Sequence, residues 1–136
     1  MEVFGKTLKE LFMNAAEALG DILSSQVKSK KVLPAGRQVK VKSELKEKIK
    51  VKSVNLHILL VDFLNEILAK SQINKRVFKV KGLMLKENSL EAELISQKVE
   101  EFDEDVKAVT YHEVDIRQTT NDKRQKIWQT KLVFDI

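Results

Sequence analysis

Cysteine is absent from this chain of 136 residues, so disulfides, thiol nucleophiles and thiolate metal sites are all excluded. Histidine occurs only twice, which argues against a histidine-based metal centre, because such a centre usually needs several histidine ligands. The sequence also lacks a Gly-rich phosphate loop, a Gly-x-Ser-x-Gly elbow and a His-Glu-x-x-His motif. No pattern therefore assembles a nucleophile, a base and an oxyanion hole, and we predict that the protein is not an enzyme.

Long apolar runs are also missing. The most apolar stretch, residues 56–68, is interrupted by polar groups and cannot span a bilayer, so we predict no membrane contact. The N-terminus has neither a basic region nor an apolar region of the kind that directs export. We therefore expect a cytoplasmic protein.

The composition is that of one folded domain. Hydrophobic residues make up 43% and charged residues 33% of the chain, and its length suits a single core, so we predict one domain over residues 1–136. The net charge is +5, which weakly favours acidic partners such as RNA. Basic residues concentrate in 28–52 and acidic residues in 91–105, which predicts two opposed faces.

Two helices are predicted from capping residues and apolar spacing. Thr7 and Glu10 form a capping box before apolar residues that recur every three or four positions, which predicts a helix over 8–24. Asn55 is a suitable N-cap for a second, central helix that presents one broad apolar face.

Alternating patterns predict the strands. Val39–Ser43 and Ile49–Ser53 repeat the same lysine alternation ten residues apart, and we expect that only one of them belongs to the core. The later candidate strands, which suggest an antiparallel meander, are 77–85, 90–97, 106–118 and 125–135. The fold class predicted from this order is α+β, an antiparallel β-sheet with two helices packed on one face.

Four blocks in order resemble the archease family: Gly5–Ala16, Leu59–Leu68, Val106–His112 and the C-terminal Val133–Ile136. The resemblance covers residues 2–24 and about 46–136. Two departures from the family pattern stand out. Archeases normally begin with an Asp-His-Thr-Ala-Asp-like segment that this sequence lacks, and residues 32–45 read as an inserted loop.

The resemblance implies a function. Archeases are non-catalytic partners that activate the 3′-phosphate/5′-hydroxyl RNA ligase of tRNA splicing or RNA repair, by promoting ligase guanylylation and turnover. The family's divalent-metal site carries over to Asp135 and the terminal carboxylate of Ile136. Without the N-terminal aspartate we expect weak binding of Ca²⁺ or Mg²⁺, which take six or more oxygen ligands. Indirect contact with tRNA is also expected.

Each of these residues has a plainer interpretation. Asp135 can be a solvated aspartate at a frayed terminus. His112 is either a partner-contact or second-layer residue, or an ordinary strand histidine. Lys107 and Tyr111 can contact the ligase or simply be exposed. We interpret His57 as incidental. Asp62, Asn65 and Glu66 lie on the polar side of the second helix, where acids and amides occur for solubility alone, and we interpret them as structural.

The lysines of the alternating segments can touch tRNA phosphates, but no aromatic residues are interleaved among them as a stacking platform requires. A solvated strand face is the simpler interpretation of Lys40, Lys42, Lys48, Lys50 and Lys52. The alternative function, of a different class, is therefore a basic RNA-binding or chaperone-like adaptor for a tRNA-modifying enzyme.

Overall fold

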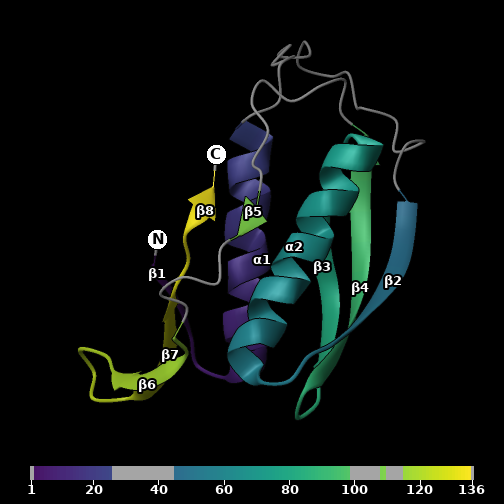
Figure 1. Ribbon diagram of the computed structural model, residues 1–136. Coiled ribbons are helices and arrows are strands. Elements are labelled where there is room, and N and C mark those ends of the chain that lie inside the picture. The colour runs from purple at the N-terminus through teal and green to yellow at the C-terminus, as the bar shows by residue number, and fades with distance from the viewer. Residues whose placement is uncertain (1, 26–44, 99–107, 110–114, 136) are drawn as a thin grey trace.

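The computed structural model of the chain describes residues 2–25, 45–98, 108–109 and 115–135 (Figure 1). Its helices are α1 (Leu8–Ser25) and α2 (Leu56–Asn74). Its strands are β1 (Glu2–Gly5), β2 (Leu45–Lys52), β3 (Arg76–Leu85), β4 (Ser89–Lys98), β5 (Ala108–Val109), β6 (Arg117–Thr120), β7 (Lys126–Lys131) and β8 (Phe134–Asp135). No helix in these ranges is long and apolar enough to cross a membrane.

The two helices begin where the sequence predicts. The Thr7 hydroxyl accepts a hydrogen bond from the Glu10 backbone N–H at 3.1 Å, and the Asn55 side chain accepts one from Ile58 N–H at 2.9 Å. Each bond satisfies a backbone donor that has no partner within the first helical turn. At its other end, α2 stops at Lys75, which adopts a left-handed φ of 51° and donates its N–H to the Ser71 carbonyl.

The strands form two three-stranded antiparallel sheets, ordered β2-β4-β3 and β1-β7-β6, and a short pair, β5-β8. The α+β class is confirmed, and α1 and α2 pack against β2-β4-β3. The prediction that the last four strands form a single meander is wrong, because β3 and β4 belong to one sheet and β6 and β7 to the other. Strand β2 takes the place beside β4, because its apolar residues then meet those of β4 on the inner face, with Ile49 opposite Ala92 and Val51 opposite Leu90.

The two long C-terminal strands predicted at 106–118 and 125–135 are interrupted. The first range includes β5 and the beginning of β6, with Asp115 and Ile116 outside any strand, and the second is divided into β7 and β8 by Leu132 and Val133. Of the two lysine repeats, Ile49–Ser53 largely coincides with β2 and contributes to the core, whereas Val39–Ser43 lies outside the described residues. The predicted insertion at 32–45 also lies outside them, except that Leu45 begins β2.

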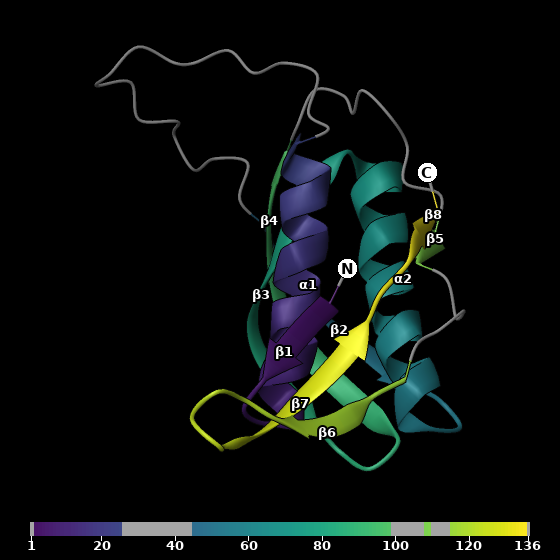
Figure 2. The same ribbon diagram turned by 90° about the vertical axis from the view of Figure 1, so that its left-hand side faces the viewer.

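Helix α1 lies between the two sheets. It packs against β3 on one side and against β1 on the other, as Figures 1 and 2 show from two directions. The rings of Phe12 on α1 and Phe63 on α2 stack in the core with centroids 6.3 Å apart, and both residues are fully buried. At the turn from β1 into α1, a Cβ on Gly5 would lie 2.4 Å from the Leu11 nitrogen, so only glycine fits there.

Polar contacts also join α2 to β2. The Lys70 ammonium lies 2.7 Å from the Glu47 carboxylate, with about a third of each side chain exposed. Beyond the end of β2, the Ser53 hydroxyl donates to the Asp62 carboxylate. Asp62 therefore has a specific structural contact, which agrees with its interpretation as a structural residue and goes beyond solubility.

Candidate functional site

The candidate site starts from a polar side chain on α2. The amide nitrogen of Asn65 donates to the Val109 carbonyl at 2.9 Å, and the amide oxygen of Asn65 accepts from the Val109 N–H at 2.7 Å. Both backbone groups of Val109 are thereby satisfied by one side chain, as a neighbouring strand would satisfy them. Asn65 therefore has a structural role, as predicted, and its partner Val109 belongs to the block Val106–His112 that resembles the archease family.

His57 makes the corresponding contact further along the chain. Its Nδ1 accepts a hydrogen bond from the Ile116 N–H at 2.9 Å, across 59 residues of sequence. Interpreting His57 as incidental is therefore wrong. Val109 and Ile116 flank residues 110–115, so the chain on both sides of that stretch is fastened to α2. The helix uses its apolar face for the core and its polar side for these attachments.

Strand β5 in turn pairs with β8. Ala108 is opposite Asp135 and Val109 is opposite Phe134 in an antiparallel ladder of two residue pairs. Figure 2 shows this pair lying alongside α2. The backbone of Asp135, the predicted metal ligand, is thus connected through β5 to Asn65.

The other predicted site residues, Lys107, Tyr111, His112 and Ile136, lie outside the described residues, as does the side chain of Asp135. Their roles remain predictions. Within the described part of the chain there is no group of three or more His, Cys, Asp or Glu side chains that could hold a metal ion. The residues described therefore do not complete a cage of six or more oxygen donors.

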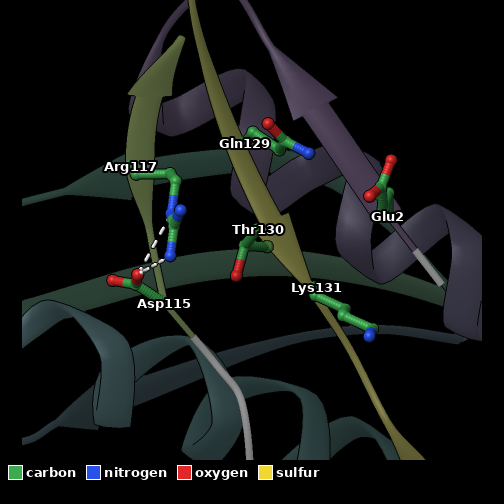
Figure 3. A pocket seen from close by; sticks show the side chains of 6 residues that line it. All are labelled: Glu2, Asp115, Arg117, Gln129, Thr130 and Lys131. Carbon is green, nitrogen blue, oxygen red and sulfur yellow. Dashed lines mark hydrogen bonds and ion pairs between the residues drawn. The ribbon is translucent and has the colours of Figure 1, made fainter.

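A cavity of about 410 Å³ opens beside β1, β6 and β7 (Figure 3). It is lined by Glu2, Asp115, Arg117, Gln129, Thr130 and Lys131. The Arg117 guanidinium donates from Nε to the Asp115 carboxylate at 3.0 Å. Two acids and two bases are present among the described lining residues, so these side chains together give the cavity no net charge.

Among the lining residues that the structure describes, Thr130 alone is buried, at 1% exposure. Its hydroxyl has no hydrogen-bond partner among the described residues. The alternation predicted for the last strand agrees with this burial, since Thr130 and Leu132 face inward.

Sequence reasoning missed Asn65 and His57 because their partners are backbone groups 44 and 59 residues away. A weak signal was nevertheless present. An amide inside a strongly apolar helix lowers the hydrophobic contribution at that position, and a half-buried amide normally has hydrogen-bond partners. Both residues also lie in or near the helix block that resembles the family.

Comparison with known proteins agrees with the resemblance. The family described as "Archease protein family (MTH1598/TM1083)" matches residues 1–136. The archease of Methanosarcina barkeri is 28% identical over 144 residues, which cover 99% of this chain and 87% of that protein. The archease of Pyrococcus abyssi is 31% identical over 144 residues, which cover 98% of this chain and 88% of that protein.

Two solved structures share the fold. One is an archease and possible chaperone from Thermotoga maritima, with a TM-score of 0.58 and 16% identity over 100% of this chain and 88% of the other. The second is protein 1598 of Methanobacterium thermoautotrophicum, with a TM-score of 0.55 and 25% identity over 99% and 89%. From the full-length family match and these relatives, the chain belongs to the archease family.

Proposed function

We propose that this archease is a non-catalytic protein that activates an RNA ligase of the 3′-phosphate/5′-hydroxyl type in the cytoplasm. Its role is to promote guanylylation of the ligase and repeated turnover in tRNA splicing or RNA repair. Membership of the archease family supports this proposal. In this scheme the ligase carries out the chemical steps, and the archease contributes a surface that binds the ligase.

The observation that carries the proposal is the double hydrogen bond between Asn65 and Val109. It ties the β5-β8 pair, and with it the backbone of Asp135, to the central helix of the fold. A contact surface that must fit a partner needs such support, because residues held on a rigid element lose less freedom on binding.

The carboxylates at the end of the chain are the proposed contact groups. Asp135 and the terminal carboxylate of Ile136 would bind Ca²⁺ or Mg²⁺ weakly, since two carboxylates supply too few oxygen atoms for either ion. Lys107, Tyr111 and His112 complete the proposed contact with the ligase.

The geometry of β1 indicates how this site can be strengthened. Strand β1 runs antiparallel to β7, with Glu2 opposite Lys131. Residues joined before Glu2 in the same direction would run beside the stretch that leads from Lys131 to β8. An added Asp-His-Thr-Ala-Asp segment would therefore bring a further carboxylate toward Asp135.

A two-by-two ligation experiment tests the proposal. Multiple-turnover joining of RNA halves is measured with purified ligase, GTP and divalent metal. Four archease chains are compared: the present one, the chain extended by Asp-His-Thr-Ala-Asp, and Asp135→Asn in each. We expect the present chain to stimulate ligation, the extension to raise stimulation, and Asp135→Asn to remove most of that gain. Asp122→Asn, on the exposed β6-β7 turn, is the matched control.

Two outcomes would contradict this scheme. Equal stimulation by all four chains would show that the carboxylates are not the functional element, and would favour the chaperone-like adaptor. Failure of every chain to stimulate would remove the ligase proposal itself. An adaptor that only keeps the ligase soluble would raise the amount of active ligase without changing the rate of guanylylation per active enzyme.

A further inference from the structure

One face of the β2-β4-β3 sheet is packed under the helices, and no described helix or strand covers the other face, which is turned to the left in Figure 2. Alternation along β2 directs Ile49 and Val51 inward and every second residue outward. The outward residues of β2 are all lysines: Lys46, Lys48, Lys50 and Lys52.

Strand β3 adds lysines to the same face. Lys79 is exposed and shares the neighbour Ile95 of β4 with Lys46, and Lys81 is exposed at the irregularity between Val80 and Gly82. We use the term basic face for these six residues: Lys46, Lys48, Lys50, Lys52, Lys79 and Lys81.

The central strand β4 contributes the only acids of this face within the described residues, Glu91 and Glu93, which lie opposite Lys50 and Lys48. Lys50 and Glu91 approach to 3.4 Å with side chains 79% and 47% exposed, a pair too solvated to hold the lysine firmly. The six lysines outnumber the two glutamates, so the face carries a net positive charge.

The lysines of β2 form a regular row. Outward residues on one strand recur every two positions, about 6.7 Å apart. This spacing is comparable to the distance between neighbouring phosphates on one nucleic-acid strand. A regular row of phosphates can therefore meet several lysines at once, whereas an irregular cluster of cations would match only some of them.

The surface between the strands is open enough for close approach. A Cβ placed on Gly82 would meet no atom within 4 Å, so the backbone is accessible there. Two shallow hollows lie nearby: one of about 300 Å³ lined by Lys48, Gly82 and Met84 among others, and one of about 260 Å³ that includes Lys50 and Lys52.

We propose that the basic face binds the sugar–phosphate backbone of RNA without regard to sequence. The only aromatic residue of these three strands, Phe78, is buried in the core, so none of the three strands offers an exposed ring on which a base could stack. The choice of RNA rests on the proposed function, in which the ligase substrate is RNA. The basic face would then hold that substrate beside the ligase.

Lysines on edge strands also discourage pairing with other chains, and β2 and β3 are both edge strands among the described residues. This protective role predicts no affinity for RNA. It also predicts that replacing the glutamates of β4 has no effect on RNA binding, because β4 is a central strand. Binding measurements on charge variants therefore separate the two explanations.

The test is fluorescence anisotropy with labelled oligouridylate and with transcribed tRNA, titrated at several salt concentrations. Lys48→Gln/Lys50→Gln should weaken binding and lower the slope of log Kd against log salt by about 1.4, or about 0.7 for each lost phosphate contact. The matched control, Lys123→Gln/Lys126→Gln, removes the same charge from the exposed β6-β7 hairpin. It should leave the slope of log Kd against log salt unchanged. Glu91→Gln/Glu93→Gln should tighten binding.

Equal losses in the two lysine variants would overturn the proposal, because only overall charge would then matter. Tighter binding of polyglutamate than of oligouridylate at equal charge would also overturn it and would indicate an acidic protein partner. Circular dichroism melting should show that all variants remain folded. If the wild-type chain stimulates the ligase but does not bind RNA, this inference fails while the proposed function stands.

Discussion

The helix–sheet half of the molecule and its C-terminal strand pair are held together by different forces. In the first half, β4 pairs along its length with β2 and β3, and apolar side chains fill the space under α1 and α2. In the second, β5 and β8 share two residue pairs, and the polar side chain of Asn65 supports them. Burial of apolar area dominates stability in one region, and a few directed hydrogen bonds determine position in the other.

This difference implies that the overall stability of the fold and the position of the β5-β8 pair depend on different residues. Hydrophobic burial is non-directional, so the core tolerates replacement by apolar residues of similar volume. The two hydrogen bonds between Asn65 and Val109, in contrast, are both lost when the side chain of Asn65 is replaced.

The largest expected effect is global. Phe63→Ala removes a fully buried ring that stacks on Phe12, and should lower the free energy of unfolding by about 3–5 kcal/mol. Urea denaturation followed by circular dichroism measures this loss. The control is Phe4→Ala, since Phe4 is 43% exposed and should lose far less. Equal losses at the two positions would contradict the assignment of the core.

The second effect is local. Asn65→Leu keeps a similar volume but leaves the N–H and carbonyl of Val109 without their partner, at a cost of about 1–3 kcal/mol. Hydrogen exchange at Val109 should accelerate more than exchange in β4, and ligase stimulation should fall. Asn74→Leu makes the same substitution at an exposed position of α2 and is the control. Unchanged exchange at Val109 would show that β5 does not depend on Asn65.

The smallest effect has the opposite sign. Thr130→Val replaces a buried hydroxyl that has no partner among the described residues with a methyl group, and should raise the free energy of unfolding by about 1 kcal/mol. Thermal unfolding measures the gain, with Thr119→Val on β6 as the control. A loss of stability at Thr130 would show that the hydroxyl has a partner after all, such as a water molecule in the cavity of Figure 3.

Local sequence signals predict the helices and the strands of the helix–sheet half, but not the position of β2 beside β4. Thr7 and Asn55 marked the helix starts because capping depends on residues only three positions away. Alternation found β3 and β4 to within a residue or two, because both strands have one buried face. The family resemblance and the α+β class followed from the same blocks.

The C-terminal half was harder to predict, because its structure depends on distant contacts. Alternation continued through 106–118 and 125–135, but the chain changes partners within both ranges, and pattern alone does not report a change of partner. Asn65 and His57 looked like ordinary polar residues of an amphipathic helix, since nothing near them in sequence shows which backbone groups they bind.

The attachment of Val109 and Ile116 to one helix has a consequence for engineering. Asn65 and His57 are eight residues apart on α2, a separation of about 12 Å along the helix axis. The pitch of α2, rather than any strand ladder, therefore fixes the spacing of these two attachment points. An insertion or deletion within α2 between His57 and Asn65 would therefore change the distance between these two points, even where it left the apolar core intact.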